Sequence, residues 1–256
     1  MARRPFDVLP VYGTSIADID QTRFECEYFP RAVDAKNLAA NDRSLAQRLT
    51  AAKMIETEGG AATVLGLLML GNNTRDFIPG AYVQFLRIAG EEMSDEIIDD
   101  MAVYGMVPYI IEKLDLKLQS HNRRRVEIAT GTPRERRTQT YPMEALQELV
   151  HNALIHRSYE GTHAPVRVTW FDDRIEIQNS GGAFGDVKQD NFGQPGVVDY
   201  RNPNLAEAMR AMGYVQRFGV GIKIARKLLA EAGHPELEFA ISATHVLATV
   251  RPVPGS

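Results

Sequence analysis

Three polar side chains of different chemistry recur at every fourth position in the segment that begins at Tyr141. They are Glu148, Asn152 and His156. In an α-helix a four-residue step turns by only about 40°, so these side chains would lie along one face. A carboxylate can act as a base toward water, an amide oxygen can ligate Mg²⁺, and His156 or the adjacent Arg157 can meet a phosphate. The stripe therefore indicates a site for a metal ion, phosphates and a water, and the alternative is a solvated helix face.

Two glycine-containing turns follow along the chain. Asn179 comes at the end of a predicted strand and is followed by Gly181 and Gly182, which permit backbone amides to approach a ligand. Gly219 and Gly221 precede a predicted helix, whose first amides form an anion site. Residues 180–200, which follow the first turn, are Gly-rich, and loops of roughly that length are often functional lids. Each turn alone is equally consistent with an ordinary tight turn, but their order after the polar stripe favours a ligand site.

The elements that must position these residues alternate between helix and strand. The sequence predicts a helix from Pro142 to about Ser158, strands at 166–170 and 174–177, a helix from Asn202-Pro203 to Gly213, a helix from Gly221 to Gly233, and strands at about 237–241 and 245–251. This order predicts an α/β sandwich in which the helices cover one face of a mixed sheet. We expect it to occupy residues 141–256.

Residues 1–140 are expected to form a smaller α+β region. The predicted elements are a helix at 42–56, strands at 61–70 and 81–88, a helix at 98–119 and a basic hairpin at 123–140. The apolar run Val64–Leu70 has the length of a strand buried on both faces. The stretch Glu91–Asp100 holds six carboxylates. We interpret it as a solvated loop leading into the start of a helix, where negative charge suits the helix dipole.

The hairpin concentrates positive charge in an otherwise acidic chain. Its six arginines and two glutamates give residues 123–140 a net charge of +4. The arginines are Arg123, Arg124, Arg125, Arg134, Arg136 and Arg137. They could contact DNA phosphates, with an affinity that falls steeply with salt. The alternatives are a solvated hairpin, or one that pairs with the acidic stretch of the same or a neighbouring chain.

Bulk properties exclude several classes of protein. The net charge of −4 and the isoelectric point near 5.9 exclude a uniformly basic nucleic-acid coat. The single Cys26 excludes an internal disulfide and a thiolate zinc cluster, and it fits a reducing cytoplasm. No run of about 18 apolar residues is present, so we expect no membrane span. Self-association of the chain stays open.

Three motifs carry a family resemblance. They are Tyr141-Pro-x-x-Ala-Leu-x-Glu-x-x-x-Asn-Ala-Leu-Ile-His-Arg157, Arg201-Asn-Pro203 and Gly219-x-Gly-Ile222. The segment that starts at Tyr141 resembles the GHKL (Bergerat) ATPase domain of histidine kinases, gyrase and the MutL repair protein. More narrowly, it is similar to bacterial proteins described as RecG-related ATP-dependent DNA helicases or transcriptional regulators. Thr63–Gly71 and Phe6–Pro10 look like the middle region of that family, so the resemblance covers nearly the whole chain.

The resemblance implies ATP and Mg²⁺ as ligands. It gives Glu148 the role of general base and Asn152 that of Mg²⁺ ligand, and it puts Asn179, with its companion Gly181, at the adenine amino group. The full set implied to bind the cofactor is Asn152, His156, Arg157, Asn179, Gly181, Gly182, Arg201, Gly219 and Gly221. Two departures weigh against hydrolysis: Asn179 is an amide where the ATPases have an aspartate, and Ser158 replaces the usual aspartate after His-Arg.

The resemblance also sets the expected function. No Gly-x-x-x-x-Gly-Lys-Ser/Thr phosphate loop is present, so a helicase motor is not expected, and a weak Mg²⁺-dependent ATPase stays open. In the family a DNA-binding domain precedes this region, which implies that DNA is bound through an upstream domain absent from this chain. We expect a regulatory module of a bacterial transcriptional regulator with a degenerate ATP site. The alternative is a DNA-binding, scaffolding or dimerisation module that keeps the fold without nucleotide.

Overall fold

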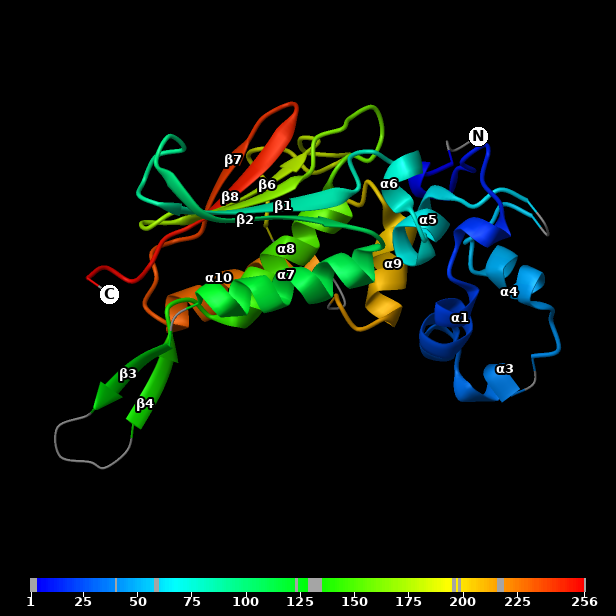
Figure 1. The fold of residues 1–256 in the computed structure, drawn as a ribbon, viewed down its shortest axis with the longest axis horizontal. Coiled ribbons are helices and arrows are strands. Elements are labelled where there is room, and N and C mark those ends of the chain that lie inside the picture. Colours follow the sequence, from blue (N-terminus) through cyan, green and yellow to red (C-terminus); the bar gives the residue numbers. More distant parts are fainter. Residues whose placement is uncertain are drawn as a thin grey trace.

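The computed structural model describes residues 4–39, 41–57, 60–122, 124–128, 135–194, 197, 199–215 and 219–255. The side chains of residues 39, 124–128 and 135–139 are outside this description. Within the described residues, the central element of the fold is a six-stranded mixed sheet (Figure 1). The strand order is β2-β1-β5-β6-β8-β7. The predicted α/β class with a mixed sheet is therefore confirmed.

The strands of the sheet come from both sides of residue 140. They are β1 (Tyr82–Ala89), β2 (Glu96–Tyr104), β5 (Val166–Trp170), β6 (Ile175–Ser180), β7 (Glu238–Ile241) and β8 (His245–Val250). Strand β1 runs parallel to β5, and the other neighbouring pairs are antiparallel. Because β1 and β5 are paired directly, the two regions predicted from the sequence share one sheet. They also share one continuous core of buried apolar side chains.

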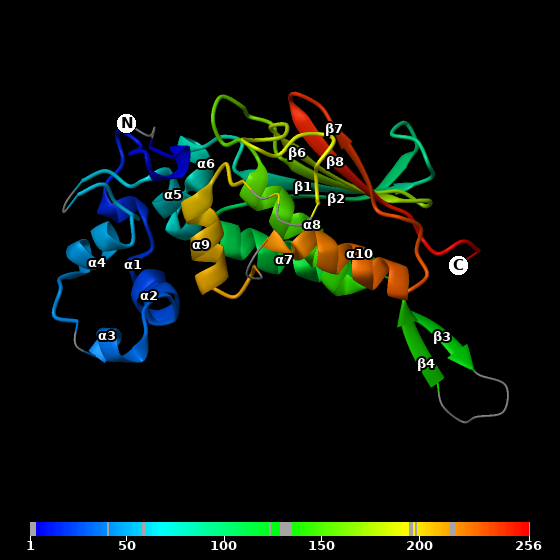
Figure 2. The same cartoon turned by 180° about the vertical axis from the view of Figure 1, so that it is seen from behind.

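Three long helices lie against one face of this sheet (Figures 1 and 2). They are α7 (Val107–His121), α8 (Met143–His156) and α10 (Gly221–Glu231). Burial alternates along β6 and β8, as expected for strands with one covered face. Helices α8 and α10 are neighbours, and this pairing brings the polar stripe of α8 beside the N-terminus of α10.

The N-terminal residues form a layer of short helices that packs on α9 (Pro203–Ala211). These are η1 (Phe6–Val8), η2 (Ile16–Asp18), α1 (Gln21–Arg23), η3 (Phe24–Tyr28), α2 (Phe29–Ala32), α3 (Ala35–Ala39), α4 (Leu45–Ala51), α5 (Val64–Leu70) and α6 (Thr74–Phe77). Asp7 is fully buried, and its Oδ2 accepts hydrogen bonds from the amides of Asn204 at 2.7 Å and Leu205 at 3.0 Å. A carboxylate at this point satisfies the first free amides of α9 and so fixes where that helix begins.

The predicted strand at 61–70 is wrong, because these residues include helix α5. Thr63 caps the helix by accepting a hydrogen bond from the Gly66 amide at 3.0 Å. Every residue of Val64–Leu70 is buried, so the sequence has no polar face whose spacing could distinguish a helix from a strand. Gly66 also lies against the Met54 carbonyl, since a Cβ there would approach its oxygen to 2.0 Å.

The predicted helix at 98–119 is wrong in its first part, which belongs to β2. Gly105, with a φ of +124°, forms the turn between β2 and α7, and Pro108 lies in the first turn of α7. Carboxylates suit β2 because it is an edge strand of the sheet, where charge discourages pairing with other chains.

The predicted helix at 42–56 is shorter than expected: α4 starts after the Ser44 cap and ends before Lys53, whose φ is 60°. The predicted strand at 81–88 matches β1.

The basic hairpin consists of β3 (Arg124–Ile128) and β4 (Glu135–Gln139), which pair in antiparallel register and project away from the body (Figures 1 and 2). Its two ends are held together by Asn122, whose Nδ2 donates to the Tyr141 carbonyl at 2.8 Å and whose Oδ1 accepts from the Tyr141 amide at 3.0 Å. The residues that connect the strands, together with Arg123, Arg134 and the side chains of the other four arginines, lie outside the described residues.

Candidate functional site

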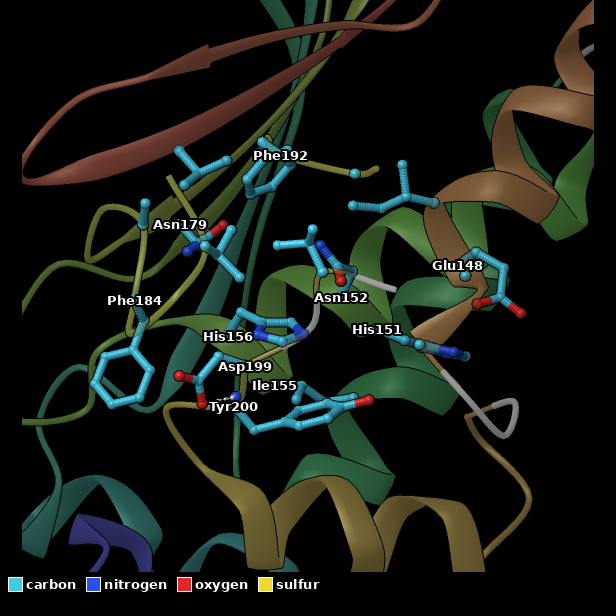
Figure 3. Close-up of a pocket in the computed structure, with 18 of the residues that line it drawn as sticks. Glu148, His151, Asn152, Ile155, His156, Asn179, Phe184, Phe192, Asp199 and Tyr200 are labelled. Atoms are coloured by element: carbon cyan, nitrogen blue, oxygen red, sulfur yellow. Dashed lines mark hydrogen bonds between the residues drawn. The ribbon is translucent and has the colours of Figure 1, made fainter. Parts of the chain in front are cut away.

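A cavity opens between α8, the N-terminus of α10 and the loop that follows β6 (Figure 3). It comprises about 1010 Å³ of empty space, part of which is open to solvent. Seven residues singled out in the sequence line it: Glu148, Asn152, His156, Asn179, Gly182, Gly219 and Gly221. The fold thus brings together, around one space, residues that are up to 73 positions apart in the chain, from Glu148 to Gly221.

The cavity also has lining residues that sequence reasoning did not single out. These include His151, Phe184, Phe192, Asp199, Tyr200, Lys223 and Val246. His151 could have been found, because it lies one position before Asn152 on the same helix and so borders the stripe. The aromatic residues of the loop carried no such signal, since their positions depend on how the loop folds back over the helix.

Glu148 lies at the end of the cavity next to α10. Its residue is 8% exposed, and a Cβ built on Gly221 would come within 2.6 Å of Oε2. Only glycine therefore lets the helix start approach the carboxylate this closely. Burial raises the pKa of Glu148, and the nearby Glu144 carboxylate adds to the rise. A carboxylate with a raised pKa next to a ligand cavity is suited to proton transfer.

Two imidazoles on α8 are held in the neutral form. Burial lowers the pKa of His151 to about 4, and burial together with the Arg201 charge lowers the pKa of His156 to about 4, against an opposing effect of Asp199. The His156 ring stacks on Tyr200 at a centroid distance of 5.2 Å. The Nε2 atom of His151 is buried and has no hydrogen-bond partner among the described residues. It is therefore available to a ligand or to a water in the cavity.

Acidification is expected to destabilise the fold through these two imidazoles. In the folded chain both stay neutral down to about pH 4, where their lowered pKa values lie, whereas in the unfolded chain each binds a proton near its ordinary pKa of about 6.5. The unfolded state holds more protons across this window, so the free energy of unfolding falls as pH falls from about 6.5 toward 4. The change His156→Phe keeps a stacked ring but removes one titration, and it should flatten the pH dependence measured by urea denaturation.

The exposed His163 provides the matched control for that measurement. His163→Phe should leave the slope of unfolding free energy against pH as it is in the unmodified chain. If His156→Phe and the unmodified chain had the same slope, the neutral, half-buried imidazole at position 156 would be contradicted.

Asn179 lies at the opposite end of the cavity from Glu148, with Asn152 between them (Figure 3). It is 5% exposed, and its Nδ2 donates to the Ser180 carbonyl at 3.2 Å. Its Oδ1 is therefore left as an acceptor. Gly181 has a φ of +89°, and its amide donates to the Thr244 carbonyl at 2.7 Å. This glycine serves the turn and is not part of the cavity lining, in contrast to Gly182.

The two predicted arginines lie outside the cavity lining. Arg157 is fully buried, and its guanidinium donates to the carbonyl oxygens of Gly80, Ser158 and Ala164. The predicted contact between Arg157 and a phosphate does not fit this placement, because its donors are directed at the protein backbone. Arg201 borders an adjacent pocket instead.

The donor set for a metal ion is sparse. No cluster of three His, Cys, Asp or Glu side chains that could hold a metal occurs in the part of the chain that the structure describes. Mg²⁺ commonly takes only one or two protein ligands, and the rest come from water and substrate phosphates. Asn152 reaches the cavity without a side-chain hydrogen bond to another described residue, so its amide oxygen fits such a partial set.

Among the described helices, none is long and apolar enough to cross a membrane.

The geometry defines an α/β protein with a ligand cavity between α8, which carries the polar stripe, and α10, which begins with Gly221. Residues 163–250 match a protein-family model described as "Putative ATP-dependent DNA helicase recG C-terminal". This match supports a GHKL-like, RecG-related C-terminal region. It includes Asn179 and the two glycines at the start of α10, and it begins after α8.

The fold is similar to the crystal structure of the DIP2311 protein from Corynebacterium diphtheriae, with a TM-score of 0.70 and 18% sequence identity. The similarity covers 97% of this chain and 48% of that protein, so the chain spans about half of its length. At this identity the likeness concerns the fold. A search of curated protein sequences finds no significant match.

Proposed function

We propose that the cavity binds an adenine nucleotide with Mg²⁺ and that this region is a regulatory module of a bacterial transcriptional regulator. The observation that carries the proposal is the convergence of Glu148, Asn152 and Asn179, with the glycine start of α10, on one cavity. The family match at 163–250 supports a nucleotide as the ligand. A helicase motor is not proposed, because the chain contains no phosphate loop.

The residues of the cavity fit the parts of such a ligand. The Oδ1 of Asn179 would accept a hydrogen bond from the adenine amino group, since the Nδ2 is engaged by Ser180. The first amides of α10 have no side-chain cap and would meet the phosphates. The Asn152 oxygen would help to hold Mg²⁺, which would neutralise phosphate charge. We assign Glu148 the role of a base toward water, which its raised pKa supports.

The test is thermal unfolding with and without saturating ATP and MgCl₂. A ligand at about 100 times its Kd stabilises the folded state by roughly 2.7 kcal/mol, so a clear rise of Tm is expected. Asn152→Ala should abolish that rise, because it removes the amide oxygen from the centre of the cavity. Asn72→Ala, at an exposed asparagine outside the cavity lining, should keep it. An unchanged Tm with saturating nucleotide in the unmodified chain would refute the proposal.

The basic hairpin supports a second candidate function, contact with DNA. It carries a net charge of +4 and projects from the body of an acidic protein (Figure 1). We expect the double change Arg136→Glu and Arg137→Glu to weaken DNA binding and to lower the slope of log K against log salt by about 2, since each arginine that neutralises a phosphate contributes about 1 to this slope. Filter binding or fluorescence anisotropy over a salt series measures this slope.

A double change on the N-terminal layer is the control for net charge. Lys36→Glu and Arg43→Glu alter the charge equally at exposed positions away from the hairpin, and they should leave the slope unchanged. DNA binding that is absent, or that is independent of salt, would contradict the candidate.

A further inference from the structure

A second pocket adjoins the nucleotide cavity. It comprises about 850 Å³ of empty space, part of which is open to solvent, against about 1010 Å³ for the nucleotide cavity, and it lies between the N-terminal segment, the turn after α8 and the start of α9. Its walls include Arg4, Phe6, Glu160, Arg201 and Asn202, and it shares Phe184 and Tyr200 with the nucleotide cavity. The motif Arg201-Asn-Pro203, to which the nucleotide cavity gives no role, therefore lines a pocket of its own.

Two polar atoms of this motif are buried without partners among the described residues. They are Nε of Arg201 and Oδ1 of Asn202. Asn202 is fully buried, and its Nδ2 donates to the carbonyls of Ile155 at 2.6 Å and Arg157 at 2.9 Å. These bonds fix the orientation of the amide and leave Oδ1 as an unused acceptor. Buried polar groups are normally satisfied, so such an atom at a pocket wall points to a ligand or a water.

Arg201 has donors to spare. Of its five N–H groups, one is engaged by the Gly182 carbonyl, with Nη2 at 3.2 Å from the oxygen. Among the described residues, Glu160 is the carboxylate whose charge favours that of Arg201; it acts through space and not through a hydrogen bond, and it lies on the same pocket. A planar guanidinium with free donors matches the oxygens of a carboxylate or phosphate.

We propose that this second pocket binds a small oxyanion that also carries a hydrogen-bond donor, such as a hydroxy acid or a hydrogen phosphate. The oxyanion pairs with Arg201, and the donor group meets Oδ1 of Asn202. A single ligand of this class satisfies both of the atoms that the protein leaves without partners.

The bound oxyanion is coupled to the nucleotide cavity through shared walls. The Arg201 guanidinium lies 4.7 Å from the centre of the Phe184 ring, and it also bonds Gly182. The adjacent Tyr200 stacks on His156. Both ligands therefore order the same two side chains, Phe184 and Tyr200, and the second ligand to bind meets walls that are already ordered. The pocket is in this way a regulatory site, an inference that rests on the proposed function for its effect on nucleotide.

Direct binding is tested first, by calorimetry at constant ionic strength with glycolate, acetate and inorganic phosphate as probes. Glycolate should bind about tenfold more tightly than acetate, because only glycolate has a hydroxyl for Asn202. Arg201→Gln should weaken glycolate at least tenfold, and Arg201→Lys should weaken it less because the charge remains. Phosphate binding that is lost in Arg201→Gln would identify phosphate as a further member of the ligand class.

Two variants serve as controls. Arg210 lies on α9, the helix that follows Arg201, and its Nε is also buried without a partner among the described residues, but it does not line the pocket; Arg210→Gln should therefore bind glycolate normally. Asn152→Ala, in the nucleotide cavity, should do so as well, which separates this test from that of the proposed function. Equal affinities for glycolate and acetate, an effect of Arg201→Gln no greater than that of Arg210→Gln, or no binding of any probe would overturn the site.

Coupling is tested by titrating ATP and MgCl₂ with and without saturating glycolate. The affinity for ATP should rise about fivefold with glycolate, and the rise should vanish in Arg201→Gln. Normal glycolate binding with an unchanged ATP affinity would overturn the coupling. If ATP did not bind at all, the proposed function and the coupling would fail, and the oxyanion site would still be decided by the direct binding experiment.

Discussion

Arg157→Ala is expected to lower the free energy of unfolding by about 3 kcal/mol or more. The side chain is fully buried and lies over the Tyr159 ring at 4.5 Å, so its removal leaves a cavity. The carbonyl oxygens of Gly80, Ser158 and Ala164 would also lose a charged donor. Burial lowers the pKa of Arg157, which shows that the charge itself is costly to bury, but the lost hydrogen bonds and the cavity together outweigh that relief. Urea denaturation measures the difference.

Two comparisons make this result specific. Arg157→Met keeps most of the volume and removes only the donors, so its loss of stability should be smaller than that of the alanine variant. Arg167→Ala, at an exposed position of β5, should change the free energy of unfolding by less than about 0.5 kcal/mol. If Arg157→Ala were as stable as the unmodified chain and lost only its response to ATP, the interpretation of Arg157 as a phosphate ligand would be correct after all.

The position of Arg157 explains why so much stability depends on one side chain. It follows the last turn of α8, and its donors reach the segments that lead into β1 and β5. These strands form the parallel pair of the sheet. Gly80 is required for this arrangement, because a Cβ there would lie 2.7 Å from Nη2 of Arg157. Arg157 thus fastens the helix that carries the polar stripe to the centre of the sheet.

The C-terminal elements were predictable because their residues alternate visibly. Strands β6 and β8 have one buried face, and glycines or prolines mark the ends of the helices. Helix α5 offered no such pattern, because every one of its residues is buried. Edge strand β2 was mistaken for a helix because its carboxylates looked like a solvated helix start, and only its pairing with β1 makes it a strand.

The site was predictable in part for the same reason. The spacing of Glu148, Asn152 and His156 gives one helical face directly. The spacing could not predict where the Arg157 side chain points. Arg157 follows the last residue of the helix, where the backbone becomes extended and the helical periodicity no longer applies. The pocket beside Arg201 depends on Arg4 and Phe6, almost two hundred positions earlier in the chain, and no local pattern reports such a contact.

Gly221→Ala is expected to reduce nucleotide affinity at least tenfold while keeping or raising the stability of the fold. The new Cβ would stand 2.6 Å from Oε2 of Glu148, so the carboxylate must shift from its place beside the start of α10, where we propose that the phosphates bind. Gly221 begins α10, and its φ is not in the left-handed region, so alanine gains helix propensity of up to about 1 kcal/mol. Calorimetric titration of ATP and MgCl₂, together with urea denaturation, measures both effects.

A double-mutant cycle identifies the cause of that loss. If the displaced carboxylate is responsible, Glu148→Ala should make room for the new methyl group, and adding Gly221→Ala to Glu148→Ala should cost little further affinity. If the methyl group itself blocks the amides of α10, the loss caused by Gly221→Ala should be the same in both backgrounds. Full nucleotide affinity in the single variant Gly221→Ala would contradict the proposal that phosphates meet the start of α10. The nucleotide affinity is expected to fall while the free energy of unfolding is kept or raised, so a variant that has simply unfolded cannot give the same result.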